Sequence, residues 1–326
     1  HPHARGRNSI FTGRRIAVKI AVLCEALIDF KATGPLEFKG FPGGSPLNVG
    51  AACARLGQPT GFVGQLSTDL FGEILLEYLR NNALNTEFVS RSSAPTTLGF
   101  VDDSGEHPRY AFLRNGAADA LYSPTPLPTL PDSLRFIHFG SISLLEDPTR
   151  TSIENLVQQS RARATVVLDP NVRPSLISDH AEYLERFTFW VSLAHLVKLS
   201  EEDAAWLYPH FTLEDVSKTL LEGGCDAVII TRGSRGAELF LKSGQKLEVN
   251  APQVQVVDTV GAGDTFSAGL MVSLLEQGVA PTQDWTKLSL ETWKAALLFA
   301  CQAAALNCTR AGCDPPTRAE LREVLK

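Results

Sequence analysis

The sequence predicts an α/β protein with a mainly parallel central sheet flanked by helices, together with a small additional β-sheet. Short β-rich runs alternate with amphipathic helical patterns along most of its 326 residues, an order typical of parallel sheets covered by helices. Two segments, 27–44 and 97–114, instead show strand alternation with no helix between their strands. With 44% hydrophobic residues, the chain is long enough to bury a large core.

The main sheet is expected to form from buried apolar runs, most of them separated by helical stretches. The expected strands are "RIAVKIAVL" (15–23), "TGFVGQL" (60–66), "RFIHFGSI" (135–142), "ATVVLDPN" (164–171), "HLVKLS" (195–200) and "DAVIITRG" (226–233), with a further strand at 237–242. The expected helices include residues 47–57, 72–82, 151–161 and 213–224. Crossovers between parallel strands should be right-handed.

Segments 30–42 and 97–114 are interpreted as a small β-layer outside the main sheet, with "DDSGEH" (102–107) as a hairpin turn. Such a layer can act as a lid that excludes water, although an ordinary surface hairpin would show the same pattern. Residues 1–14 are basic and lack the apolar core of a secretory signal. They are expected to be a flexible tail, either an expression remnant or a transit peptide, and residues 15–326 to be one domain.

Composition argues against several classes of protein. The net charge is −6 and no run of Lys or Arg dominates, which argues against nucleic-acid binding. No apolar run approaches the ~20 residues that a membrane span needs. The six cysteines form no Cys-x-x-Cys pair and most have apolar neighbours, so we expect reduced thiols and a cytoplasmic protein without a zinc site.

The stretch "DTVGAGDTFSAGL" (258–270) places an acidic residue in a glycine-rich turn that opens a helix, because the apolar spacing is helical from Thr265 onward. The first N–H groups of a helix are unpaired and attract anions. Asp264 could simply cap the helix. A catalytic interpretation uses more of the stretch: the backbone N–H groups of Ala262, Gly263 and Asp264 would stabilise a transferring phosphoryl group, while the carboxylate of Asp264 accepts the proton of the attacking hydroxyl.

A second stretch, "FPGGSPLNVGAACARLG" (41–57), combines paired glycines with a helix start. Gly43 and Gly44 would let the backbone approach a ligand closely. Asn48 in the first helical turn offers an amide donor and acceptor to hydroxyl groups. The alternative is a glycine turn that leads into a tightly packed alanine-rich helix.

Together these stretches resemble the two signatures of the PfkB (ribokinase-like) family of carbohydrate kinases, the first continuing through "FVGQLSTDLFGE" (62–73). Within the family the chain is most similar to fructokinases, through "EALIDF" (25–30), "LDPNVRPSL" (168–176) and "CTRAGCDPPTRAEL" (308–321). The resemblance implies a ribokinase-like three-layer fold with a β-sheet lid, and ATP and Mg²⁺ as phosphoryl donor and metal.

The resemblance also implies roles for individual residues. Asp264 would be the catalytic base, and Gly261, Ala262 and Gly263 would form the anion hole. The sugar would be bound by Asp29, Gly43, Gly44, Asn48, Phe100, Phe112 and Arg173. Without the family context, Asp29 would be a solvated loop acid, Arg173 a surface residue, and the two phenylalanines lid packing.

On the nucleotide side, the residues implied are Lys198, Thr231, Gly233, Gly236 and Asn307, the last near the adenine. Lys198 stands where the family has the Asn of its Asn-x-x-Glu element, and Glu201 would orient Mg²⁺ through water. Ser200 and Asp203 nearby form a capping pattern, which is an alternative or additional reason for this sequence. Asp258, with backbone carbonyls, would bind a monovalent cation, for which K⁺ is the candidate.

The sequence therefore predicts an ATP-dependent kinase acting on the primary hydroxyl of a ketose, with fructose and its 6-hydroxyl as the leading candidate. The alternatives are a 2-keto-3-deoxygluconate kinase or nucleoside kinase of the same family, or a non-catalytic sugar-binding regulatory protein. Exposed lid edges would allow a homodimer through the lid.

Overall fold

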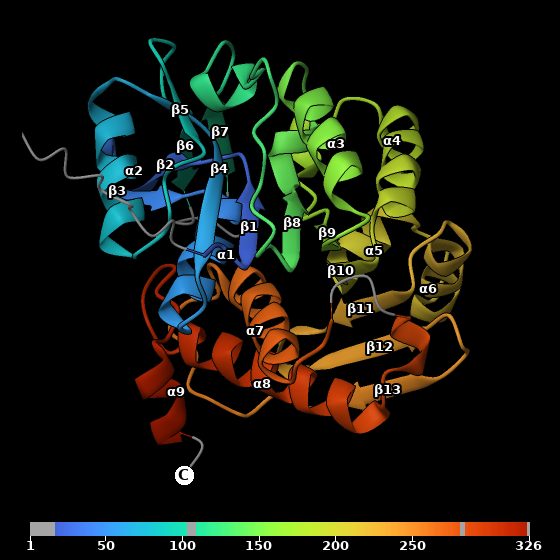
Figure 1. Cartoon of the computed structure of the whole chain (residues 1–326). Helices are drawn as coiled ribbons and strands as arrows, with labels where there is room; N and C mark the ends of the chain where they lie inside the picture. The colour runs from blue at the N-terminus through green and yellow to red at the C-terminus, as the bar shows by residue number, and fades with distance from the viewer. Residues whose placement is uncertain (1–16, 103–108, 281–283, 325–326) are drawn as a thin grey trace, which may run out of the picture.

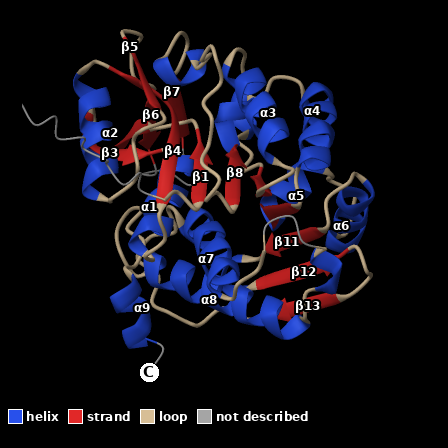
Figure 2. Cartoon of the chain, viewed as in Figure 1, coloured by secondary structure: helices blue, strands red, loops and turns tan. Residues whose placement is uncertain are grey.

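The computed structural model describes residues 17–102, 109–280 and 284–324, and within these ranges the chain forms two sheets flanked by helices (Figures 1 and 2). The larger sheet has the strand order β13-β12-β11-β10-β9-β8-β1-β4-β5. All neighbours from β11 through β5 are parallel, whereas β12 and β13 join antiparallel at one end. The expected mainly parallel sheet is confirmed.

Seven strands of this sheet coincide with the expected runs, although the first is shorter than expected, and β5 and β13 were not expected. The strands of the sheet are β1 (Ile20–Leu23), β4 (Thr60–Ser67), β5 (Val89–Ser92), β8 (Phe136–Gly140), β9 (Thr165–Asp169), β10 (Leu196–Ser200), β11 (Ala227–Thr231), β12 (Ala237–Leu241) and β13 (Lys246–Val249). The α-helices are α1 (Ser45–Arg55), α2 (Leu70–Asn81), α3 (Thr149–Ser160), α4 (His180–Leu193), α5 (Glu201–Leu207), α6 (Leu213–Glu222), α7 (Ala262–Glu276), α8 (Leu290–Cys308) and α9 (Arg318–Val324). Short 3₁₀ helices are η1 (Ala118–Leu121), η2 (Ser141–Leu144), η3 (Pro174–Leu176), η4 (Gly233–Arg235) and η5 (Trp285–Lys287).

Helices cover both faces of the large sheet, because its strands are apolar on both sides. In β1, Ile20 and Val22 pack into a core with α1, α7 and α8, whereas Ala21 and Leu23 face a second core with α3 to α6. Helix α7 is buried around most of its surface and lies beside α8 (Figure 1). The three expected layers are therefore present, and α7 is buried from Asp264 to Leu274.

The expected β-layer forms the second sheet, called the lid below, with the order β3-β2-β6-β7. Its strands are β2 (Leu27–Gly34), β3 (Glu37–Gly43), β6 (Leu98–Asp102) and β7 (Arg109–Leu113). The expected "DDSGEH" turn falls, after Asp102, outside the described residues, as do residues 1–14. The lid packs on α2, where the rings of Phe30 and Phe71 meet edge to face with centroids 5.7 Å apart (Figure 1).

No helix in the described ranges has the length and apolar character required to cross a lipid bilayer. All six cysteines lie in the described part of the chain and are free thiols, and four of them are buried. The expectation of reduced cysteines agrees with this arrangement.

Candidate active site

The glycine-rich turn at 258–264 opens α7, as expected, but Asp264 is not its N-cap. Gly261 is the N-cap, in a left-handed conformation with φ of 75°, which favours glycine. A side chain at Gly261 would also overlap the Sγ atom of Cys313. Asp264 is the third helical residue, so the interpretation of this carboxylate as a simple cap is wrong.

The start of α7 leaves backbone donors available to an anion. Within the described residues, the N–H groups of Gly263 and Asp264 have no acceptor, whereas the N–H of Ala262 donates to the carbonyl of Thr259 at 3.2 Å. Two of the three N–H groups predicted to face a phosphoryl group, those of Gly263 and Asp264, are therefore available, and the anion hole itself remains a prediction. Gly263 is exposed, and a Cβ placed on it would meet only the Nζ of Lys198, 3.0 Å away.

The carboxylate of Asp264 is buried, with 8% exposure, and both of its oxygens are held. The hydroxyl of Ser45 donates to Oδ1 at 2.6 Å, and Nδ2 of Asn48 donates to Oδ2 at 2.9 Å. Burial raises the pKa of Asp264, although these two hydrogen bonds and the charge of Lys198 oppose the rise. A raised pKa makes this carboxylate a better proton acceptor than a free aspartate.

Only the Nδ2 atom of the Asn48 amide is hydrogen-bonded to Asp264. Oδ1 of Asn48 is buried and has no hydrogen-bond partner in the described part of the chain. Buried acceptors of this kind are rare and normally have a ligand or water partner. The expectation that Asn48 binds a substrate hydroxyl remains a prediction, and this unpaired oxygen supports it.

Asp29 lies on β2, and its carboxylate is close to Gly43 of β3 and Gly99 of β6. A Cβ on Gly43 would overlap Oδ2 of Asp29, and a Cβ on Gly99 would lie 2.7 Å from Oδ1. Burial raises the pKa of Asp29 from its ordinary value of 3.8 to about 6. Within this net shift, the charge of Arg173 lowers the pKa of Asp29 and the charge of Asp264 raises it, so all three side chains are close enough to interact.

The register of the lid separates the two predicted phenylalanines. Phe112 pairs with Gly99, which pairs with Asp29, so these residues share one face of the lid. Phe100 pairs with Phe30 on the opposite face, where the two rings stack with centroids 5.2 Å apart. The expectation that both phenylalanines cover the sugar is therefore wrong for Phe100, which belongs to the aromatic cluster that packs the lid onto α2.

Arg173 lies in the loop after β9, exposed, with its Nη1 donating 2.9 Å to Oδ1 of Asn171. The loop is held by Asp203, whose Oδ1 accepts the N–H of Val172 at 2.9 Å. The other oxygen of Asp203 completes a capping box with Ser200 at the start of α5, as the capping pattern predicted. The position beside Asp29 is compatible with a role of Arg173 in substrate binding, which remains a prediction.

Lys198 is buried next to the start of α7 and forms an ion pair. Its Nζ lies 2.8 Å from Oδ2 of Asp169, and the two side chains are 4% and 2% exposed. Burial alone would lower the pKa of Lys198, but the adjacent Asp169 outweighs it and keeps the pKa above its usual value. Ser267 of α7 donates to the same Asp169 oxygen at 3.2 Å. A permanent positive charge thus lies beside the free N–H groups of the helix.

Other predicted nucleotide residues lie along the ends of neighbouring strands. Thr231 ends β11, and Gly233, with φ of 56°, lies in η4 with no atoms near its would-be side chain. Gly236 has a different role, because a Cβ there would overlap the carbonyl oxygen of Val249 on β13. Its conformation serves the packing of these strands, so no nucleotide contact is needed to explain it.

Glu201, predicted as a water-mediated magnesium residue, forms a bidentate ion pair with Arg235 at 2.5 and 2.6 Å. Both partners are partly exposed, so the pair is weak enough to exchange. A single carboxylate suits Mg²⁺, which keeps waters and substrate phosphates as its other ligands. In the described residues, no three His, Cys, Asp or Glu side chains are grouped to hold a metal by themselves.

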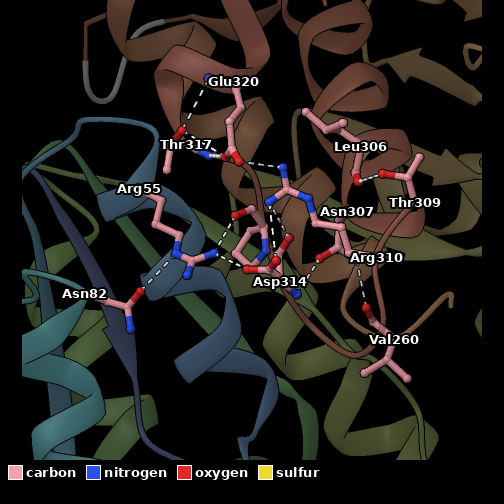
Figure 3. A network of polar contacts seen from close by, with 11 residues as sticks. Arg55, Asn82, Val260, Leu306, Asn307, Thr309, Arg310, Asp314, Thr317 and Glu320 are labelled. Carbon is pink, nitrogen blue, oxygen red and sulfur yellow. Dashed lines mark hydrogen bonds and ion pairs between the residues drawn. The ribbon is translucent and has the colours of Figure 1, made fainter. Parts of the chain in front are cut away.

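Side-chain hydrogen bonds hold the loop before α7 in place, and Figure 3 shows those of Asn307. Asn307 is fully buried; its Nδ2 donates to the carbonyl of Val260 at 2.8 Å, and its Oδ1 accepts the N–H of Asp314 at 3.0 Å. A buried side chain with both amide atoms engaged cannot reach an adenine, so that expectation is corrected.

Asp258, predicted as a monovalent-cation residue, accepts the N–H groups of Val260 and Gly312, at 3.0 and 2.9 Å. Its role in binding a cation remains a prediction.

Sequence reasoning missed three residues of the site. Ser45, Glu25 and Asp169 were not among the predicted residues, although Ser45 contacts the base directly. Glu25 and Asp169 each follow or end a buried parallel strand, the edge at which α/β sheets bind ligands. An acidic residue at the end of an apolar run could therefore have identified Glu25 and Asp169 as candidate site residues.

Residues 19–320 match the model of the pfkB family carbohydrate kinases. The chain belongs to the pfkB family. It is 36% identical to a fructokinase of Rhizobium leguminosarum bv. trifolii over 259 residues, which span 78% of this chain and 79% of the relative. It is 33% identical to probable fructokinase-5 of Arabidopsis thaliana, covering 93% of this chain and 95% of the relative.

Solved structures of pfkB-like kinases show the same fold. A fructokinase of Vibrio cholerae O395 bound to fructose, ADP and calcium has a TM-score of 0.84 at 26% identity, covering 95% of this chain and 99% of that one. A fructokinase of Xylella fastidiosa with bound ATP has a TM-score of 0.84 at 28% identity, covering 94% and 98%. An aminoimidazole riboside kinase of Salmonella enterica has a TM-score of 0.83 at 27% identity, covering 94% and 100%. This pfkB kinase is thus a carbohydrate kinase by family and fold.

Proposed function

We propose that this protein transfers the γ-phosphoryl group of ATP to the 6-hydroxyl of fructose. The observation that carries the proposal is the buried Asp264, fixed by Ser45 and Asn48 and placed beside the free N–H groups at the start of α7. A proton acceptor next to an anion-binding helix end is the arrangement that phosphoryl transfer to an alcohol requires. The names of the fructokinase relatives support the choice of sugar.

In the proposed reaction, the 6-hydroxyl oxygen attacks the γ-phosphorus and the bond from that phosphorus to the bridging oxygen of ADP breaks. The hydroxyl proton passes to Asp264. The N–H groups of Gly263 and Asp264 and the ammonium of Lys198 stabilise the charge on the transferring group. Alignment of the reactants and charge stabilisation supply most of the rate enhancement, and the base supplies a smaller share.

The sugar would lie between Asp29 and Asp264. Asp29 can accept hydrogen bonds from two neighbouring hydroxyls, with Gly43 and Gly44 allowing close approach and Phe112 on the same lid face. Oδ1 of Asn48 would accept a third hydroxyl. Mg²⁺ would be bound by ATP phosphates, waters and Glu201, and would neutralise phosphate charge. Asp258 would contribute to a monovalent cation site in the loop that Gly312 closes.

A panel of substrates tests this proposal. Phosphorylation of fructose, ribose, 2-keto-3-deoxygluconate, adenosine and aminoimidazole riboside should be compared in one ADP-coupled assay, with fructose expected to have the highest kcat/KM. A higher value for a riboside would favour the nucleoside-kinase alternative, for which the similarity to the Salmonella riboside kinase is the supporting observation. A non-catalytic regulator is disfavoured because the base and the glycines of the anion hole are intact.

The raised pKa of Asp29 predicts a pH dependence of sugar binding. Its ionised form accepts the hydroxyl hydrogen bonds, so the affinity for fructose should fall as the pH drops through about 6. Calorimetric titrations between pH 5 and 8 would measure this, within the pH range in which the fold remains intact. An affinity that stays flat across about pH 6 would contradict the assigned role.

The same shift predicts that Asp29→Asn stabilises the fold while it abolishes sugar binding. The folded-state pKa lies above 3.8, so the ionised carboxylate destabilises the fold above about pH 6, and this cost disappears below about pH 4. Asp29→Asn should therefore gain on the order of 1–2 kcal/mol in the free energy of unfolding at pH 8 and little at pH 4. Asp69→Asn is the control. It should instead lower the free energy of unfolding at pH 8, because hydrogen bonds lower the pKa of Asp69 at the start of α2.

We also infer that two chains associate through their lids. The strands β3 and β7 are the edges of the lid sheet, and exposed apolar side chains occur on both. These side chains are Phe38, Phe41, Tyr110 and Leu113. Light scattering should give twice the mass of one chain, and Leu113→Glu, at a position 62% exposed, should reduce it to a single chain.

A further inference from the structure

The lid joins the rest of the molecule at four places, and a buried polar or charged side chain lies at each of them. Glu25 precedes β2, Ser45 follows β3, Thr97 precedes β6 and Arg114 follows β7. Among the described residues, hydrogen bonds to two buried acids hold these positions, Glu25 in the first hairpin and Asp119 in the second. We call Glu25, Arg114 and Asp119 the hinge cluster. Their exposures are 2%, 7% and 3%.

Asp119 connects the ends of the second lid hairpin. Its Oδ1 accepts the hydroxyl of Thr97, and its Oδ2 accepts Nε of Arg114 at 3.4 Å. Asp119 itself is fixed to the core, because its carbonyl accepts the hydroxyl of Thr149 on α3 at 2.7 Å. The preceding carbonyl, of Ala118, accepts Nε2 of Gln65 at 2.8 Å. The entry and exit of this hairpin are thus anchored to one rigid carboxylate.

Glu25 connects the ends of the first lid hairpin. Its Oε1 accepts the N–H of Ser45 at 3.2 Å, and its Oε2 accepts the N–H and the hydroxyl of Ser143 in η2, each at 2.7 Å. The hydroxyl of Ser45 donates in turn to Asp264. A continuous hydrogen-bonded chain therefore runs from η2 through Glu25 and Ser45 to the proposed base.

Arg114 contacts Asp119 and acts on Glu25 through its charge. It hydrogen-bonds Asp119, and its positive charge opposes the rise that burial causes in the pKa of Glu25. Its Nη1 is 3.3 Å from a carboxylate oxygen of the half-exposed Glu146, but Nη2 is buried without a hydrogen-bond partner in the described residues. A buried donor without an acceptor is costly, and such groups normally have a ligand or water partner.

Each sugar-facing residue of the lid is close in sequence to one of these contacts. Asp29 is four residues from Glu25, Gly43 two from Ser45, and Phe112 two from Arg114. We propose that the hinge cluster is a set of positioning residues that holds the lid, and with it Asp29 and Phe112, at the correct distance from Asp264. The proposal rests on the sugar kinase activity proposed above. An error of about 1 Å in such positioning can lower a rate about 100-fold.

Conservative substitutions separate positioning from mere stability. Arg114→Lys and Glu25→Gln should raise KM for fructose about 10-fold or more, while KM for ATP changes less than about twofold. More ATP should also be hydrolysed per fructose 6-phosphate formed, because a misplaced lid admits water. Arg163→Lys is the matched control, since Arg163 donates to the carbonyls of Leu130 and Pro131 away from the lid, and it should change neither KM.

A second variant covers the case in which the charged substitutions prevent folding. Thr97→Val removes one hydroxyl from Asp119 and should cause a smaller rise in KM for fructose in the same direction. Variants that lower the melting temperature but leave both KM values within about twofold of wild type would overturn the proposal. Hydrogen exchange of β2, β3, β6 and β7 without substrate gives a readout independent of the activity: the hinge variants should accelerate it. If the wild-type protein phosphorylates no fructose but the hinge variants still exchange faster, the proposed function is contradicted, whereas the role of the hinge cluster in holding the lid is supported.

Discussion

Replacing Asp264 by asparagine is expected to lower kcat by about 100-fold or more and to leave KM for fructose within about threefold of wild type. Asparagine cannot accept the proton of the 6-hydroxyl, whereas the sugar is bound mainly by Asp29 and Asn48. The fold should tolerate the change, because the new side-chain oxygen can still accept Nδ2 of Asn48 while the new Nδ2 donates to the hydroxyl oxygen of Ser45, which leaves Oδ1 of Asn48 free for the sugar. Steady-state kinetics and fructose calorimetry measure the two quantities separately.

Asp215→Asn provides a matched control for Asp264→Asn. Asp215 is also the third residue of a helix, α6, where it forms a capping box with Thr212 far from the site. Its replacement should lower the melting temperature slightly and leave kcat unchanged. If Asp264→Asn retains more than about a tenth of wild-type kcat, Asp264 is not the base.

Replacing Lys198 by methionine is expected to lower kcat by about 100- to 1,000-fold and to raise KM for ATP. The ammonium is the only side-chain cation that lies against Gly263 in the described structure, where it would face the transferring phosphoryl group. Methionine keeps the length of the side chain and removes the charge. Kinetics with ATP as the varied substrate measure both effects.

The substitution also leaves Asp169 buried without its partner, which should cost about 3–5 kcal/mol of stability. The double variant Lys198→Met with Asp169→Asn removes both charges and should recover most of the melting temperature. The kcat of the double variant should not recover, because this variant still lacks the ammonium group of Lys198. A double variant that regains wild-type kcat would show that Lys198 acts only through stability.

Much of the fold could be predicted from the sequence because it is encoded over short distances. The apolar runs of β8 to β11 and the helical spacing of α7 are visible in windows of a few residues. The capping box of Ser200 and Asp203 was likewise predicted and confirmed, since its partners are three residues apart. Asp264 was identified as the acid at the start of a helix from the same local pattern.

Two errors arose where a prediction needed the register of a sheet or the burial of a side chain. Phe100 and Phe112 both look like lid aromatics, but strand pairing places them on opposite faces, and a shift of one residue would reverse this. Asn307 follows a helical pattern that carries no sign of its complete burial. Its partners, Val260 and Asp314, are brought to it only by the packing of α8 against α7.

The sequence by itself determined the layered α/β architecture, the separate lid and the glycine turn that carries Asp264, because propensity and apolar periodicity act between near neighbours. Only the tertiary structure decided which groups surround that carboxylate. Ser45 lies 219 residues from Asp264 in the chain, and Lys198 meets Asp169 because β9 and β10 pair in parallel. Such contacts depend on how whole strands and helices pack, and no local pattern of residues specifies that.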